Sequence, residues 1–431
     1  MDLQFKNNFR NLAVGLALST CSLFAQSGTI TASYTFPDLP IGPLQNAVLP
    51  GTIPNDHGFL LGGVGSGLYR SFLEGPNVYW MVTDRGPNPM AGSLRTWPMP
   101  GFTPWLLKVR TNSNGAIDVL QKLPLLNPNG TAVTGLTNSS RDEVARECDG
   151  VTTIPFNPNG LDTEDLVRTL DGNFWLVEEH SPSFIRVSPN GKVSKRFLPV
   201  GVDLPGTAYP ISNVLPKIYG DKRKQNRGFE GVTLGWDLRT LYAALQSPLS
   251  NPTAAIGNAS RNTRILAFDA YSETTKAEYV YRFQPVTEFN HTNPTEMKIS
   301  AVAALDPWRL LVLERTDAVA KIYRVDLTRA TNILNSKWDD TATSPSLEAL
   351  DDAGLLAENV KVLPKELIID LSTVAGMLPK IEGMTILDWN TIAISNDNDF
   401  DIAPAATCGT NVGTGAKSKI LIVKTTKNLF F

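Results

Sequence analysis

Acidic side chains recur at two positions in this sequence, at the start of one apolar segment and at the end of the next. The first position is held by Glu164, Glu230 and Glu382. The second is held by acidic or polar residues: Asp84, Glu178 and Glu179, Gln246, Glu314, Asn396 and Asp397. Carboxylates gathered in one place repel one another unless something neutralises them. Since hard cations such as Ca²⁺ prefer carboxylate oxygens, the pattern predicts a site for a divalent cation.

Arginines stand beside several of these acids, in Asp84-Arg85, Arg227 before Glu230, and Glu314-Arg315. A guanidinium next to a bound cation is a good receptor for phosphate. A metal ion and an arginine together support phosphoester hydrolysis, because they polarise the ester and activate water. The first hypothesis is therefore a metal-dependent hydrolase of a small phosphoester. In it, Arg85 and Arg227 hold the phosphate, and the cation, most simply Ca²⁺, is held by Asp84, Glu179, Glu230, Glu382 and Asp397.

The segments that carry the acids recur as well. The clearest copy runs from Gly160 to Phe197 and contains four short apolar runs separated by turns such as Asp171-Gly172. Asp-Gly between two apolar runs is a strong hairpin signal. Related copies start near residues 62, 230, 300 and 382. Four-stranded units repeated at a long period are typical of a β-propeller. We therefore expect an all-β fold, a β-propeller with five or six four-stranded blades.

The propeller explains why distant acids should meet. In an antiparallel hairpin, the start of the first strand and the end of the second lie at the same edge of the sheet. The first strand of every blade lines the central channel, so both sets of acids should surround one mouth of that channel. A strand near residues 31–36 and the last strand, near 420–425, are expected to share one blade and close the ring without a free edge.

Strand-end acids are also common as turn formers or solvated rim residues, so two other interpretations stay open. One is a non-catalytic propeller that binds a ligand or partner at this face, with cations serving the structure. The other is metal-dependent hydrolysis of a lactone or carboxylic ester, which uses similar ligands. The three histidines, at positions 57, 180 and 291, do not have the spacing of a zinc protease, and the sequence contains no Gly-x-Ser-x-Gly elbow.

The first 25 residues have the features of a secretory signal peptide. Lys6 and Arg10 precede the apolar run Leu12–Leu18, and Ala25 is a suitable cleavage point. The rest, 26–431, is predicted to be a single domain, exported to the periplasm or the medium, without a membrane span and monomeric. Leu18-Ser19-Thr20-Cys21 also resembles a lipoprotein processing box, which leaves a lipid-anchored form as the alternative.

Composition and cysteine count add two expectations. The formal net charge of -3 gives no basic surface for nucleic acid. Cys148 and Cys408 remain after processing, and an exported pair can form a disulfide.

Several motifs together resemble the phytase-like family, also described as "esterase-like activity of phytase". The motifs are Thr83-Asp84-Arg85-Gly86-Pro87-Asn88, Gly160-Leu161-Asp162-Thr163-Glu164-Asp165, Glu178-Glu179-His180-Ser181-Pro182-Ser183, Asn226-Arg227-Gly228-Phe229-Glu230-Gly231 and Asn396-Asp397-Asn398-Asp399-Phe400. The resemblance spans about residues 55–425 and implies a phytase-like propeller domain, exported, that hydrolyses phosphoesters with Asp and Glu as active groups.

Carried over position by position, the resemblance implies a set of acidic site residues: Asp84, Asp162, Glu164, Glu179, Glu230, Glu382 and Asp397. Of these, Glu179 and Glu230 are the predicted catalytic acids, together with Arg85 and Arg227. The sequence departs from the family pattern at His180, where an aromatic residue is expected, and at Gln246, where other blades carry an acid.

Overall fold

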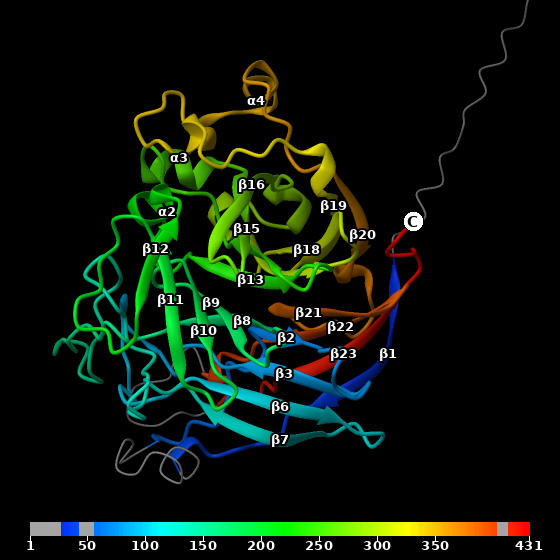
Figure 1. Ribbon diagram of the computed structural model, residues 1–431. Helices are drawn as coiled ribbons and strands as arrows, with labels where there is room; N and C mark the ends of the chain where they lie inside the picture. Colours follow the sequence, from blue (N-terminus) through cyan, green and yellow to red (C-terminus); the bar gives the residue numbers. More distant parts are fainter. Residues whose placement is uncertain (1–26, 43–55, 403–412) are drawn as a thin grey trace, which may run out of the picture.

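The fold is a five-bladed β-propeller. The computed structural model describes residues 27–42, 56–402 and 413–431. Five sheets surround a central channel, and Figure 1 places the inner strands β2, β8, β13 and β21 at its centre. The all-β prediction is confirmed, and the blade number, expected as five or six, is five.

The blades follow one another along the chain, each with its innermost strand first. Blade one contains β2 (Gly67–Tyr69), β3 (Val78–Val82), β6 (Trp105–Thr111) and β7 (Ile117–Pro124). Blade two contains β8 (Thr163–Arg168), β9 (Phe174–Glu178), β10 (Ser183–Val187), β11 (Val193–Pro199) and a fifth strand, β12 (Ile211–Leu215), parallel to β11. Blade three contains β13 (Phe229–Leu234), β14 (Thr240–Leu245), β15 (Asn262–Asp269) and β16 (Thr274–Arg282).

Blade four contains β17 (Lys298–Ala304), β18 (Arg309–Arg315), β19 (Ala320–Asp326) and β20 (Lys365–Asp370). Blade five contains β21 (Ile381–Asp388), β22 (Thr391–Asn396), β23 (Lys419–Thr425) and, as its outer strand, β1 (Gly28–Thr35). The antiparallel pairing of β1 with β23 confirms the predicted closure of the ring by the two ends of the domain. A small hairpin, β4 (Met90–Ala91) and β5 (Leu94–Arg95), and short helices α2 (Lys217–Lys222), α3 (Ala254–Ala259) and α4 (Asp352–Ala357) lie outside the blades.

Apolar side chains between neighbouring blades hold the ring together. Blade one meets blade two through Trp80 and Phe174, whose ring centroids are 4.7 Å apart. Blade two meets blade three through Phe184 and Phe268, stacked at 4.8 Å. Comparable buried clusters join blades three and four, four and five, and five and one. Consecutive residues of many strands are therefore buried, as in β9 and β15, since both faces of every blade are covered by its neighbours.

The inner strands approach one another so closely that glycine is required at some positions. A Cβ on Gly231 of β13 would lie 2.9 Å from the Cα of Ala301 in β17, and one on Gly383 of β21 would lie 2.8 Å from the Cβ of Leu68 in β2. The channel is thus closed by packing in its middle and opens at its two ends. The inner strands begin at one end, which we call the acidic mouth, and finish at the other, which we call the apolar mouth.

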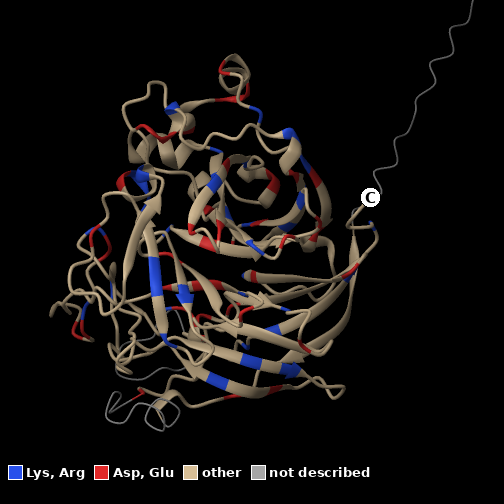
Figure 2. Cartoon of the chain, viewed as in Figure 1, with Lys and Arg blue, Asp and Glu red and all other residues tan. Residues whose placement is uncertain are grey.

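Charged side chains lie both inside the ring and on its surface. Figure 2 shows acidic and basic segments in the interior, among the inner strands, as well as on the outer loops.

No helix in the described ranges is long and apolar enough to cross a membrane. Cys148 is disulfide-bonded, while Cys21 and Cys408 lie outside the described residues, as does the predicted signal peptide 1–25.

Candidate functional site

A β-bulge recurs at the start of the inner strand in four blades. In blade two, Thr163 pairs with Glu178 and Asp165 pairs with Val177, so Glu164 has no partner across the ladder. The equivalent unpaired residues in blades three, four and five are Glu230, Ser300 and Glu382. An extra residue in one strand re-aims its side chain, and such bulges are common beside active sites. Here the bulge turns the first-strand acids toward the acidic mouth.

The second strand of each blade supplies the other half of the site. The residues that reach the cavity from the end of this strand or just beyond it are Asp84, Glu179, Gln246, Arg315 and Asp397. The residue that precedes each of them does not line the cavity, because successive side chains along a strand alternate between its faces. Glu178 pairs instead with Arg196 at 2.9 Å, and Glu314 pairs with Lys365 at 2.7 Å. The prediction that Glu178 and Glu314 belong to the mouth is therefore wrong.

These side chains surround a cavity of about 190 Å³. Every described residue that lines it is polar or charged: Ser66, Asp84, Arg85, Asn88, Arg95, Asp162, Glu164, Glu179, Asn226, Glu230, Gln246, Lys298, Arg315, Lys380, Glu382, Asp397 and Asp399. Eight of them are carboxylates and five carry a positive charge, so the lining has three more negative than positive groups at full ionisation. All seven acids predicted from the sequence are among them.

Asp162, Glu164 and Glu179 form the tightest carboxylate cluster. One oxygen of each lies within 4.8 Å of the others, and all three side chains are buried. Burial raises the pKa of Glu164 well above its usual range, and the charges of Glu230 and Asp162 raise it further. Oε1 of Glu179 is buried without a hydrogen-bond partner among the described residues. Three converging oxygens, one of them unsatisfied, fit a hard divalent cation.

Glu230 lies next to this cluster and is held in place. Burial and then the charge of Glu382 raise the pKa of Glu230 to about 7. Gln246 donates from Nε2 to Oε2 of Glu230 at 2.5 Å. Gln246, which departs from the acidic pattern, therefore orients the neighbouring acid. Burial also raises the pKa of Asp84 and of Asp397 well above the usual range, with other carboxylates adding to the effect.

Arg85 is fixed by several contacts. Its Nη1 donates to Oε1 of Glu143 at 2.7 Å and to Oδ1 of Asn226 at 2.5 Å, and lies 3.3 Å from Oδ2 of Asp162. The guanidinium also lies over the ring of Trp97, 5.5 Å from its centroid. Arg85 therefore lines the cavity, as predicted, and at the same time positions Asp162.

Arg227 takes a different place from the one predicted. It does not line the cavity, although its neighbour Asn226 does. Burial raises the pKa of Glu179 and the charge of Arg227 opposes that rise, so Arg227 lies near that acid. Nη1 of Arg227 is buried and has no hydrogen-bond partner in the described ranges. The residue supports the cluster electrostatically from outside the cavity.

His180 is completely buried beside the cluster. Its Nε2 lies 3.3 Å from Oδ2 of Asp162 and 3.3 Å from Nη1 of Arg85. Burial and then the charge of Arg85 lower the pKa of His180 well below its usual range, so the imidazole is neutral at pH 7. The side chain contacts both partners of the Arg85–Asp162 ion pair and helps to hold them in place.

The opposite wall of the cavity carries three cationic side chains, each of them paired with a carboxylate. Arg315 donates from Nε to Oγ of Ser300 at 2.6 Å and forms an ion pair with Glu382. Lys298 pairs with Asp317 at 3.0 Å. Lys380 forms ion pairs with Asp397 and Asp399. The wall thus presents three cationic side chains opposite the carboxylate cluster.

Several lining residues were missed by sequence reasoning: Arg95, Lys298, Lys380 and Asp399. Two of them follow a simple rule that the repeat would have provided. Lys298 and Lys380 stand two residues before the bulge residues of blades four and five, as Asp162 does in blade two. Arg95 comes from the β4–β5 hairpin, outside the repeat, and no sequence signal points to it.

A family model described as "Phytase-like: Esterase-like activity of phytase" matches residues 60–400. The chain belongs to the phytase-like family. This phytase-like chain is 27% identical over 301 residues to an uncharacterized secreted protein of Arthroderma benhamiae, which covers 58% of this chain and 58% of that protein. The chain thus spans a little over half the length of that relative.

Solved structures match this phytase-like protein only at low sequence identity and low TM-score. A luciferin-regenerating enzyme matches 86% of this chain and 96% of its own, with 10% identity and a TM-score of 0.34. The periplasmic gluconolactonase of Pseudomonas aeruginosa matches 83% and 88%, also with 10% identity and a TM-score of 0.34. Similarity at this level says nothing about the reaction of the phytase-like chain.

Proposed function

We propose that the acidic mouth binds a divalent cation, most simply Ca²⁺, and hydrolyses a small, soluble phosphoester. The observation that supports this most is the convergence of Asp162, Glu164 and Glu179 within 4.8 Å in a cavity with an entirely polar lining. Asp84 lies on the same side, since its charge raises the pKa of Glu164. These are the residues that would hold the cation.

Electrostatics favour a bound cation. The cavity lining has three more carboxylates than cationic side chains, and burial opposes their ionisation. Without a cation, the cluster can become neutral only by taking up protons. A bound divalent cation would let the carboxylates stay ionised at neutral pH.

When bound, the cation would supply Lewis-acid polarisation of a phosphoester oxygen. The cationic side chains of the opposite wall, Arg315, Lys298 and Lys380, would bind the remaining phosphate oxygens. Arg85 lies on the same side as the cluster and would contribute indirectly, by holding Asp162 in place. The phosphate would therefore lie between the two walls.

Glu230 is the best general base in this arrangement. A base is most effective when its pKa is near the working pH, and the pKa of Glu230 is raised to about 7. The Gln246 amide fixes the carboxylate so that Oε1 can take a proton from an attacking water. Glu179, with its unsatisfied Oε1, is assigned to the cation, although the sequence placed it in both roles.

The polar lining of the cavity also favours a polar substrate. An apolar acyl group would find no apolar side chain among the described residues of this cavity. A phosphorylated sugar or polyol offers hydroxyl and phosphate oxygens to every wall. A phosphoester therefore fits better than a lactone or carboxylic ester with an apolar part.

The test is hydrolysis of p-nitrophenyl phosphate and bis-p-nitrophenyl phosphate with Ca²⁺ and with a chelator. We expect turnover that needs the cation and that falls by about 10²–10⁴-fold in Glu230→Gln. Glu366→Gln, on outer strand β20, is the matched control and should keep full activity. Both variants are checked for native circular dichroism.

Two results would contradict the proposal. Cation binding without turnover of any phosphoester would favour a ligand-binding propeller with structural cations. Turnover of a lactone or of p-nitrophenyl acetate, lost in Glu230→Gln while phosphoesters stay intact, would favour the carboxylic-ester hydrolase.

A further inference from the structure

The apolar mouth, at the other end of the channel, is surrounded by exposed apolar side chains. In every blade, the turn between the inner strand and the second strand carries at least one: Phe72 and Leu73, Leu170, Trp236, Trp308 and Trp389. Each is between 51% and 62% exposed. All eight tryptophans of the chain are in the described ranges, and the other five are buried. Every exposed tryptophan therefore belongs to this one ring, which we call the apolar ring.

The turns are built so that their polar residues face the backbone. Oδ1 of Asp306 accepts from the backbone N–H of Trp308 and of Arg309, both at 2.8 Å. Asp237 and Asp388 fold back in the same way on the residues that follow them. The carboxylate of each turn is thus satisfied locally, and the tryptophan is left in solvent. Single exposed apolar residues need no explanation, but one per blade on the same face indicates an interaction surface.

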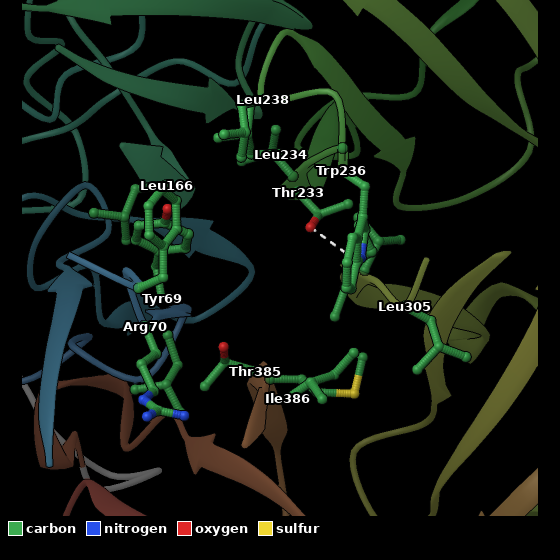
Figure 3. A pocket seen from close by; sticks show the side chains of 18 of the residues that line it. Tyr69, Arg70, Leu166, Thr233, Leu234, Trp236, Leu238, Leu305, Thr385 and Ile386 are labelled. Atoms are coloured by element: carbon green, nitrogen blue, oxygen red, sulfur yellow. Dashed lines mark hydrogen bonds between the residues drawn. The ribbon is translucent and has the colours of Figure 1, made fainter. Parts of the chain in front are cut away.

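A cavity of about 510 Å³ lies at the centre of the apolar ring. Figure 3 shows Leu166, Leu234, Trp236 and Ile386 arranged around an open space. These side chains come from three different blades, and Phe72 and Phe430 also line the cavity. Phe72 and Trp236 belong to both the apolar ring and the cavity lining, so the ring adjoins the cavity.

Both ends of the domain are fixed at this face. The backbone N–H of Thr426 donates to the carbonyl of Ser27 at 3.1 Å, and that of Leu429 donates to the carbonyl of Trp389 at 2.9 Å. The chain that precedes Ser27 therefore joins the fold beside Trp389. That preceding sequence contains the apolar run Leu12–Leu18 and Cys21, six residues before Ser27. At the other end, Phe431 is 87% exposed.

The charges on this face are largely balanced. Arg239 pairs with Asp269 at 2.6 Å, and Arg309 pairs with Asp306. A nucleic acid or a strongly acidic partner would need unpaired basic groups, so the surface is suited to an apolar contact. Tryptophan combines a large apolar ring with one N–H donor, which suits it to the boundary between lipid and water.

We propose that the apolar ring rests on the surface of a phospholipid bilayer. Trp236, Trp308 and Trp389 enter the headgroup region, while the acidic mouth, at the opposite end of the channel, faces water. Lipid is favoured over a charged partner because the charged side chains of this face are paired and three of its exposed side chains are tryptophans. This inference does not depend on the reaction at the acidic mouth.

The test uses the chain from residue 26 onward, the form left after the predicted processing, with vesicles of phosphatidylcholine and of its brominated analogue. We expect the protein to sediment with the vesicles and its fluorescence to be quenched by brominated lipid. The triple variant Trp236→Ser, Trp308→Ser, Trp389→Ser should bind more weakly, on the order of tenfold for each residue. The control variant Val151→Ser, Leu356→Ser loses two exposed apolar residues away from the ring and should bind normally.

Three outcomes would overturn the proposal. The first is a protein that stays in the supernatant with neutral vesicles and with vesicles containing anionic lipid. The second is equal binding by the triple variant and the control, which would place the contact elsewhere. The third is a dimer in sedimentation analysis that the triple variant abolishes, without vesicle binding, which would make a second copy the occupant. Melting curves of both variants verify that they are folded.

Discussion

Replacing Glu179 with glutamine should have opposite effects on stability with and without Ca²⁺. Glu179 is buried beside Asp162 and Glu164, and burial, followed by the charges of Glu230 and Asp162, raises its pKa well above the usual range despite Arg85 and Arg227. Without a cation, the substitution replaces a carboxylate, whose charge is unfavourable in this buried site, with a neutral amide. With a cation, it removes a ligand. A residue that is only a turn former would show neither effect.

The magnitude follows from the distance. Two unit charges 4.8 Å apart repel by about 3 kcal/mol at an effective dielectric constant of about 20. At about 2 cal/mol/K per residue, the entropy of unfolding of a domain of about 400 residues is about 0.8 kcal/mol/K. The variant should therefore melt higher than the parent in chelator at pH 8, by at most about 4 °C, the value for fully ionised carboxylates. Ca²⁺ at 100 times its Kd should stabilise the parent by about 2.7 kcal/mol, or about 3 °C, and the variant much less.

The assay is differential scanning calorimetry of Glu179→Gln, the parent and the control Glu366→Gln, each in chelator and in Ca²⁺. Glu366 pairs with Arg324 and Lys427 on the outer strand, so its variant should stay within about 0.5 kcal/mol of the parent and respond normally to Ca²⁺. A Glu179→Gln protein that is destabilised in chelator, or that keeps the full Ca²⁺ response, would refute the reasoning.

Three further predictions concern the pKa of a cavity acid, a buried ion pair and a closely packed glycine. The pKa of Glu230, ordinarily 4.5, is raised to about 7, so its protonation stabilises the folded state. That stability is fully present below pH 4.5 and lost as pH rises through 7; in chelator, Glu230→Gln should remove about 3 kcal/mol of the pH dependence of the unfolding free energy, measured by urea titration. Arg196→Met leaves Glu178 buried and unpaired and should cost about 3–5 kcal/mol by the same method; a cost under about 1 kcal/mol would contradict the ion pair. Gly65→Ala places a Cβ 1.9 Å from the carbonyl of Asn396 and should lower the melting temperature, whereas Gly75→Ala, 3.7 Å from its nearest neighbour, should not.

The hairpin pattern predicted the mouth and the closure of the ring because both depend on topology alone. Once Asp171-Gly172 is read as a hairpin turn, the start of β8 and the end of β9 must lie at one edge. The pairing of β1 with β23 follows because a closed ring leaves no strand edge exposed. Neither inference needs the register of a strand.

The register explains what was missed. Glu178 and Glu179 are adjacent, and a run of apolar residues does not show which of the two faces the channel. The same ambiguity affects Glu314, where Arg315 takes the cavity position. The bulge at Glu164 shifts the register of the strand by one residue. The sequence does not predict this shift, because it depends on how the two strands pair in the folded structure. Arg227 was misplaced for a similar reason: proximity to Glu230 in sequence did not bring it to the same face.

The most direct test of the proposed cation site at the acidic mouth is an anomalous difference map from crystals of the protein soaked with Tb³⁺ in place of Ca²⁺. The account predicts a strong peak at the acidic mouth, within about 2.3–2.6 Å of carboxylate oxygens of Asp162, Glu164 and Glu179. A map with no peak there, or with its main peak on the outer rim of the blades, would contradict it.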